Sequence, residues 1–246
     1  KLKVPTTYWC CVNCPGNPGA WKRHAVYHKG VKGQRKAVED GGVMQQQHRE
    51  AAEALAREAA QSGDEYHELL AEGVRYGSKQ DTRRAARAFR EAIALRPDRH
   101  RAYFSLGAAL SNSGNYVEAA QRFLEARERC SVGSKRWADA TAWAFSMLIL
   151  KPCHEVAKPE WWNDEELKAL SAMVVRAARG DATANEMRAL VLSGAMDAWE
   201  AGPRSSAELM EAAALFERSA ALHPAPAGKA DLAGKAAWCR TKAGAM

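Results

Sequence analysis

The fold of this chain is decided by two consecutive stretches of 34 residues, residues 66–99 (YHELLAEGVRYGSKQDTRRAARAFREAIALRPDR) and residues 100–133 (HRAYFSLGAALSNSGNYVEAAQRFLEARERCSVG). Aligned without gaps, they carry the same residue at several positions. Gly73 aligns with Gly107, Ala85 with Ala119, Phe89 with Phe123 and Ala92 with Ala126, whereas Pro97 aligns with Ser131. Self-similarity at a fixed period of about 20–50 residues predicts a protein built from stacked supersecondary units.

The aligned residues have sizes that suit a pair of crossing helices. Glycine and alanine at positions 73, 85, 107 and 119 are expected where the two helices of one unit cross closely, because a larger side chain would push them apart. Phe89 and Phe123 are expected to fill the space between adjacent units. Pro97 is expected to close the second helix of the first unit, since proline does not easily continue a helix.

Outward from these two units, the chain remains rich in helix formers. From about Val43 onward Ala, Leu, Glu, Arg and Met predominate. Apolar residues recur at helical spacing, and no stretch shows the sustained alternation of a strand. The predicted fold class is therefore all-α, with a helical repeat domain over residues 43–246. Beyond the clear units, this domain is expected to contain two degenerate units, at 134–180 and 182–225, and a capping helix at 226–246.

The degenerate part carries local signals of its own. Residues 151–162 are expected to form an insertion that displaces the second helix of the third unit. Asn163 or Asp164 should then cap a helix that runs to about Arg179. In the final helix, the side chains expected to face inward are Leu232, Ala236 and Trp238.

The residues shared by the two clear units resemble the tetratricopeptide repeat. The match comprises Leu69, Gly73, Tyr76, Ala85, Phe89, Ala92 and Pro97 in the first unit, and Tyr103, Leu106, Gly107, Leu110, Ala119, Ala120, Phe123 and Ala126 in the second. It covers 68 residues, about a quarter of the chain. The resemblance implies an α-solenoid of helical hairpins, in which the first helix of each pair lines a concave groove that holds a peptide or helix of a partner.

The resemblance also implies which side chains line this groove. The candidate groove residues are His67, Leu70, Val74, Arg101, Phe104, Asn112 and Lys135, with Ala138 and Ala142 extending the groove into the third unit. The alternative is that several of them pack beneath an N-terminal helix and bind nothing. A clamp for a C-terminal carboxylate, as found in some tetratricopeptide domains, is not expected, because Leu70, Val74 and Ser105 stand at the clamp positions.

The first 40 residues differ from the rest and contain a cluster of cysteine and histidine. Cys11 and Cys14 are separated by two residues, and His24 and His28 by three, with nine residues between the two pairs. Two thiolates and two imidazoles suit tetrahedral Zn²⁺, and a metal would stabilise a segment that is too short to fold on its own core. The arrangement resembles the Cys2His2 zinc finger, although the gap between the pairs is shorter than the roughly 12 residues expected. The alternatives are an arm with free thiols and a disulfide among Cys10, Cys11 and Cys14.

The positive charge of the chain is concentrated in the same segment. Residues 1–36 contain eight Lys or Arg and no Asp or Glu, whereas the rest of the chain has 28 basic and 29 acidic residues. A basic block favours an anionic partner such as a nucleic acid, a lipid surface or an acidic protein face; the alternative is a solvated tail. The candidate patch for contacts to nucleic-acid phosphates comprises Lys22, Arg23, Lys29, Lys32, Arg35 and Lys36.

Several function classes are excluded or disfavoured. The composition, 47% hydrophobic and 26% charged, is that of a folded chain, and no apolar run reaches the roughly 20 residues of a membrane span. No phosphate-binding loop, nucleophile elbow or metalloprotease motif is found, so no enzymatic activity is expected. The scattered Cys130, Cys153 and Cys239 indicate reduced thiols and hence a reducing compartment, which is the cytoplasm, the nucleus or an organelle such as a plastid.

Together these features predict a non-enzymatic tetratricopeptide scaffold or adaptor that binds a protein partner, as a subunit or linker of a larger assembly. The alternative function is that of a nucleic-acid-associated protein. In that case the basic N-terminal zinc finger would bind RNA or DNA while the repeats recruit other proteins.

Overall fold

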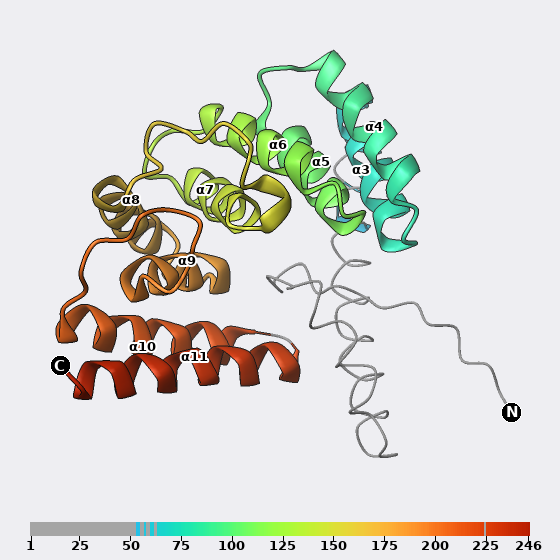
Figure 1. The fold of residues 1–246 in the computed structure, drawn as a ribbon. Coiled ribbons are helices and arrows are strands. Elements are labelled where there is room, and N and C mark those ends of the chain that lie inside the picture. Colours follow the sequence, from blue (N-terminus) through green and yellow to red (C-terminus); the bar gives the residue numbers. More distant parts are fainter. Residues whose placement is uncertain (1–52, 55–56, 58–59, 62, 224) are drawn as a thin grey trace, which may run out of the picture.

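The structure is a computed structural model, and it describes residues 53–54, 57, 60–61, 63–223 and 225–246. Within these residues the secondary structure is helical and contains no strand, which confirms the predicted all-α class for this part of the chain (Figure 1). None of the helices described is long and apolar enough to cross a membrane.

The helices follow one another with short connections over most of the chain. They are α3 (Glu65–Ser78), α4 (Thr82–Leu95), α5 (His100–Asn112), α6 (Tyr116–Glu128), α7 (Lys135–Leu148), the short 3-10 helix η1 (Lys151–Cys153), α8 (Asp164–Ala177), α9 (Ala182–Ser193), α10 (Ser206–Leu222) and α11 (Pro226–Gly244). The longest connection between α-helices lies between α7 and α8, where η1 and a loop take the place of a regular second helix. This is the segment in which the sequence predicted an insertion.

Side-chain caps explain where most of these helices begin. A side-chain oxygen at the N-cap accepts a hydrogen bond from a backbone amide of the first turn, which satisfies one of the otherwise unpaired donors. The capping residues are Asp64, Asp81, Ser134, Asn163, Asp181 and Ser205. The cap of α8 is Asn163, whose Oδ1 lies 3.0 Å from the amide nitrogen of Glu166, as predicted from the sequence.

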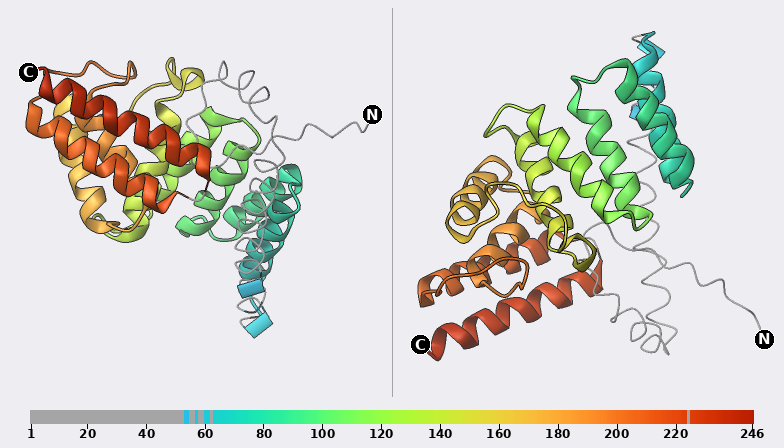
Figure 2. Two further views of the ribbon diagram at one scale, coloured as in Figure 1. Left: turned by 90° about the horizontal axis from the view of Figure 1, so that it is seen from below. Right: turned by 45° about the horizontal axis from the view of Figure 1, so that its top comes forward.

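Each helix packs against its neighbour in the sequence, from α3 and α4 at one end to α10 and α11 at the other (Figure 1). Figure 2 shows from two further sides that α10 and α11 run side by side. One departure occurs in the middle, where α9 packs against α7 as well as against α8 and α10. As a result, ten of the twelve residues of α9 are buried.

Two glycines make room for aromatic rings inside the first two hairpins. A Cβ atom on Gly73 would lie 2.7 Å from Cδ1 of Phe89, and one on Gly107 would lie 3.0 Å from Cδ1 of Phe123. The prediction that these rings only fill the space between units is therefore incomplete. Each ring lies against the glycine of its own hairpin, and Phe123 also stacks on Trp143 of α7, with 5.6 Å between the ring centroids.

The final helix corrects one sequence prediction. Leu232 and Ala236 are buried as expected, but Trp238 is 44% exposed, and the Lys242 ammonium lies 4.9 Å from the centroid of its ring. Cys239 is buried instead. The reason is helical spacing, since positions 232, 236 and 239 share one face and position 238 is rotated away from it.

Candidate partner-binding face

The groove residues predicted on α3 do not form one surface. Leu70 is only 1% exposed and belongs to the hydrophobic core, so it is not a groove residue, and that prediction is wrong. His67 is partly exposed, with its Nδ1 3.3 Å from Oδ2 of Asp64, the N-cap of the same helix. Val74 is half-buried and packs against the edge of the core.

On α5, the central predicted residue is an aromatic ring that is only partly covered. Phe104 is half-buried and packs edge-to-face against Phe123, with 5.2 Å between centroids, and against Trp143, with 6.4 Å. Arg101, in the first turn of the same helix, is half-buried, and Asn112 is exposed as its last residue. Trp143 on α7 was not among the predicted groove residues, although its ring packs against those of Phe104 and Phe123.

The predicted extension of the groove onto α7 is wrong for two residues. Ala138 and Ala142 are 0% exposed and lie in the same core cluster as residues of α9, because α9 packs directly on α7. Lys135 remains exposed in the first turn, and its Nζ lies 2.7 Å from Oδ2 of Asp139. The described surface that could receive a partner therefore ends at α7.

Half-buried apolar side chains from three helices remain on this part of the molecule. We refer to them as the aromatic strip, which comprises Val74 on α3, Phe104 and Ala108 on α5, and Trp143 on α7. Each contacts the same hydrophobic core while keeping part of its surface accessible. Partly covered aromatic rings beside a fixed core are typical anchors of protein interfaces.

Four cationic side chains stand at the N-terminal ends of α5 and α7. We refer to them as the basic edge, which comprises Arg99, Arg101, Lys135 and Arg136. The pKa of His100, which lies among them, is lowered first by burial and then by the charges of Arg136, Arg101 and Arg99.

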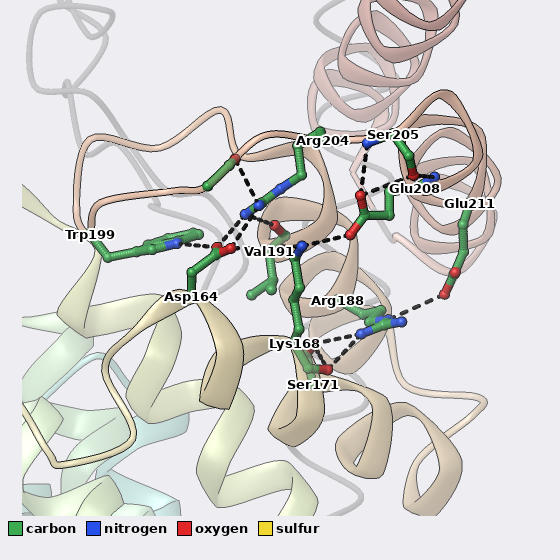
Figure 3. Close-up of polar contacts among 11 residues, drawn as sticks. Asp164, Lys168, Ser171, Arg188, Val191, Trp199, Arg204, Ser205, Glu208 and Glu211 are labelled. Atoms are coloured by element: carbon green, nitrogen blue, oxygen red, sulfur yellow. Dashed lines mark hydrogen bonds and ion pairs between the residues drawn. The ribbon is translucent and has the colours of Figure 1, made fainter.

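A second polar cluster joins α8, α9 and the loop before α10 (Figure 3). The Arg204 side chain, 3% exposed, binds both carboxylate oxygens of Asp164 and donates to the carbonyl oxygen of Val191 at 3.0 Å. Trp199 Nε1 donates to Asp164 at 3.2 Å. The Arg204 hydrogen bonds lower the pKa of Asp164 to about 2. These contacts tie α8, α9 and the loop before α10 together.

The same cluster continues onto α10. Lys168 Nζ lies 2.7 Å from Oε1 of Glu208, and Glu208 accepts a hydrogen bond from the Ser205 amide at 2.8 Å in a capping box. These contacts, led by the one from Lys168, lower the pKa of Glu208 to about 2. Arg188 of α9 donates to the carbonyl oxygen of Lys168 at 2.6 Å (Figure 3). Three helices that lack the regular hairpin spacing are thus tied together by charge-assisted hydrogen bonds.

Tryptophans fix the inserted segment between α7 and α8. Trp162 Nε1 donates to the carbonyl oxygen of Ala198 at 2.9 Å, and its ring packs against Phe145 with 5.5 Å between centroids. The Arg127 guanidinium lies 5.6 Å from the ring centroid of Trp137 and 5.4 Å from that of Trp161. The insertion is therefore packed onto the helices, and its aromatic side chains are engaged in the fold.

The described part of the chain offers no metal centre. It contains no group of three or more His, Cys, Asp or Glu side chains placed to hold an ion. Burial raises the pKa of the free thiols of Cys130, Cys153 and Cys239, which makes them poor metal ligands. The proposed zinc ligands Cys11, Cys14, His24 and His28 lie outside the described residues, as does the basic patch Lys22, Arg23, Lys29, Lys32, Arg35 and Lys36.

No protein-family model matches the chain, and no curated protein is significantly similar to it.

Proposed function

We propose that this chain is a non-enzymatic scaffold or adaptor, an α-solenoid of tetratricopeptide-like hairpins that binds a peptide or helix of a protein partner. The observation that carries the proposal is the aromatic strip, because Phe104 and Trp143 remain partly accessible although ample core surface adjoins them. The recurrence of the glycine–phenylalanine contact in two hairpins at the 34-residue period supports the repeat architecture. A binding role in a larger assembly follows from such architectures in general.

The proposal is tested by changing both Phe104 and Arg101 to Ala in the full chain. The residues of this pair are one helical turn apart, and aromatic and arginine side chains most often anchor interfaces. We expect the affinity of this variant for the protein partner to fall more than tenfold, which corresponds to a loss of about 1.4 kcal/mol of binding free energy. Met210→Ala is a matched control, since this exposed side chain lies on α10. Equal retention of the partner by both variants would contradict the proposal.

The second candidate function is nucleic-acid binding through a zinc finger in residues 1–40. It is supported by eight basic and no acidic residues in positions 1–36 and by the Cys2His2 spacing. Under this proposal Cys11, Cys14, His24 and His28 hold one Zn²⁺, and the basic patch contacts phosphates. Elemental analysis of protein purified without chelator should find about one zinc per chain. Protein without bound metal would contradict the zinc finger.

The two functions differ in which half of the chain they require. If the chain is a scaffold, changing Lys22, Arg23, Lys29 and Lys32 to Gln should weaken binding of the protein partner only slightly. The loss should be seen mainly at low salt, because salt screens exposed charges. The nucleic-acid function would be favoured by the opposite ranking, in which the Phe104 and Arg101 variant binds the partner normally and the variant of the four basic residues no longer binds it.

A further inference from the structure

The last helix of the described chain has one side that no described element covers. α11 packs mainly against α10, and Figure 1 and Figure 2 show it at the outside of the helical stack. One side of α11 is buried and comprises Gly228, Leu232, Ala236, Cys239 and Ala243. The opposite side, which we call the outer face, comprises the exposed residues Ala227, Ala230, Gly234, Ala237, Trp238 and Thr241. It carries no charge, whereas the exposed side of a terminal helix in a stack of repeats is usually polar.

Gly234, in the middle of the outer face, is not required by any contact within the described chain. Glycine inside a helix is destabilising relative to alanine unless a close approach demands it. At Gly228 the close approach is visible, because a Cβ atom there would lie 2.5 Å from Nδ1 of His223. At Gly234 a Cβ atom would meet nothing within 4 Å. Gly77 also has open space, but it is the last residue but one of α3 and is not in mid-helix. A second helix that approaches α11 closely from outside would account for Gly234.

The outer face has the spacing of helices that pack in pairs. Its small residues follow one another in alternating steps of three and four along the chain, at positions 227, 230, 234, 237 and 241. This spacing keeps a seam of residues in line on one side of a helix, where it faces a second helix. Small side chains in the seam allow the two helix axes to approach closely. Trp238, which is 44% exposed, lies beside the seam and is of the type that most often anchors an interface.

We propose that the outer face of α11 binds the same face of a second copy of this chain, with the two helices antiparallel. The seam has the symmetry that such a dimer requires. A two-fold axis between positions 234 and 237 places Gly234 opposite Ala237 of the partner subunit, and the same axis places Ala230 opposite Thr241 of the partner subunit. The antiparallel orientation also sets the positive end of each helix dipole beside the negative end of the other.

The charges beside the seam fit a second copy in this orientation. A two-fold axis perpendicular to the helices brings the same flank of both seams together. Asp231 and Lys242 lie on one flank, so Asp231 of each chain approaches Lys242 of the partner subunit. Asp231 pairs with Lys235 at 3.0 Å, yet its side chain is 60% exposed and accessible to a further contact. On the other flank, repulsion between Lys229 and Arg240 of the partner subunit is reduced, because Arg240 is paired with Glu217 of α10.

Self-association of the full chain tests the inference without any other protein. The inference does not depend on the proposed scaffold function, because the aromatic strip lies on α3, α5 and α7. Sedimentation velocity over about a hundredfold range of concentration measures the dissociation constant of the dimer. A reducing agent is present, which prevents disulfides between chains. We expect the chain to change from one copy to two as the concentration rises.

Gly234→Leu tests the close approach at the seam. A side chain at this position has open space within one chain but would separate two packed helices. Gly77→Leu is the matched control, since a Cβ atom on Gly77 also meets nothing within 4 Å. We expect the dissociation constant of the dimer to rise at least about tenfold for Gly234→Leu and less than about twofold for the control. Thermal unfolding followed by circular dichroism verifies that both variants fold.

A charge exchange tests the antiparallel register. Lys242→Glu would place two carboxylates together at each end of the seam, so we expect the dimer to weaken at least about threefold, and more at low salt. Adding Asp231→Lys restores opposite charges across the dimer. We expect the double variant to return to within about twofold of the unchanged chain.

Several outcomes would overturn the inference. A chain that remains a single copy at every concentration has no such dimer. A dimer that Gly234→Leu leaves as tight as before, or that Gly77→Leu weakens equally, associates through another surface. A double charge variant that is as weak as Lys242→Glu alone shows that Asp231 and Lys242 do not meet across the dimer, which rejects the antiparallel register and the inference with it.

Discussion

At the scale of single residues, the absence of a side chain matters most at Gly73 and Gly107. Each lies beneath a phenylalanine ring of the same hairpin, and no other residue leaves that space free. Gly77, on the same helix as Gly73, is different, since a Cβ placed there meets nothing within 4 Å. The chain therefore offers two glycines on one helix with opposite expected responses to alanine.

Gly73→Ala should destabilise the protein. Overpacking against Phe89 costs about 1–3 kcal/mol, which exceeds the roughly 0.5–1 kcal/mol that alanine gains over glycine in a helix. Gly77→Ala should gain that helical contribution without a clash. Urea denaturation of both variants measures the two effects, and a stabilised Gly73→Ala would show that the ring does not rest on the glycine.

Asp164→Asn should destabilise the protein by about 2–4 kcal/mol at neutral pH, because it leaves the buried Arg204 guanidinium without its carboxylate. The pKa of Asp164 is lowered to about 2, so its ionised form contributes stability that is complete above about pH 5 and lost as the pH falls toward 2. The variant should therefore show a shallower loss of stability in acid.

Glu165→Gln provides the control for this change, since Glu165 is exposed in the same first turn of α8. Denaturant unfolding at pH 7 and pH 3 compares the two variants with the unchanged chain. Equal effects of both substitutions would mean that the Arg204 contact contributes no more than any acid near this helix start.

At the scale of elements, α11 is held to α9 by a buried ion pair. Lys235 Nζ lies 3.2 Å from Oε1 of Glu186, which is 8% exposed, and 3.0 Å from Oδ2 of Asp231. Burial raises the pKa of Glu186, and Lys235 opposes that rise. The lysine therefore favours the charged form of a carboxylate that burial disfavours.

Lys235→Met should make stability depend more steeply on pH. Without the lysine, the folded-state pKa of Glu186 rises further above its unfolded value, so its contribution to stability falls as the pH rises through the folded-state pKa. We expect a larger loss of melting temperature at pH 8 than at pH 5. Lys229→Met, at an exposed position of α11, should show no such difference. Adding Glu186→Gln to the Lys235 variant should abolish the pH dependence.

The success of predicting structure from the sequence differs between elements. Where Gly, Ala and Phe recur at fixed spacing, helical character and register follow from side-chain size, and the cap at Asn163 follows from hydrogen bonding. The burial of Leu70, Ala138 and Ala142 could not be predicted from the sequence, because it depends on which distant helices pack over these residues. Trp143 was missed for the same reason: its partners lie on α5 and α6.

At the scale of the whole molecule, the middle of the described chain is covered more fully by other described helices than the end formed by α3 and α4. α9 is buried on nearly all sides by α7, α8 and α10, whereas α3 and α4 at one end have fewer neighbours. Backbone amides exchange through local opening, which is rarest where burial is greatest. The described structure therefore has a stable interior at α9 and an end that opens more easily.

Hydrogen exchange followed by mass spectrometry tests this difference in the full chain. We expect the amides of α9 to exchange most slowly, near the rate set by global unfolding, and those of α3 and α4 at least tenfold faster. Uniform protection of all these helices would contradict the difference.

The contact between glycine and phenylalanine also governs how hairpins of this kind tolerate insertions during evolution. In both clear hairpins the two residues are 16 positions apart, so a residue added in the turn between them would shift the ring off its glycine. In the third unit the corresponding positions hold Thr141 and Ala157, and no such contact fixes their separation. The long loop lies in that unit. The turns at 79–81 and 113–115 should therefore keep their length in descendants of this chain, while the segment between α7 and α8 is free to lengthen.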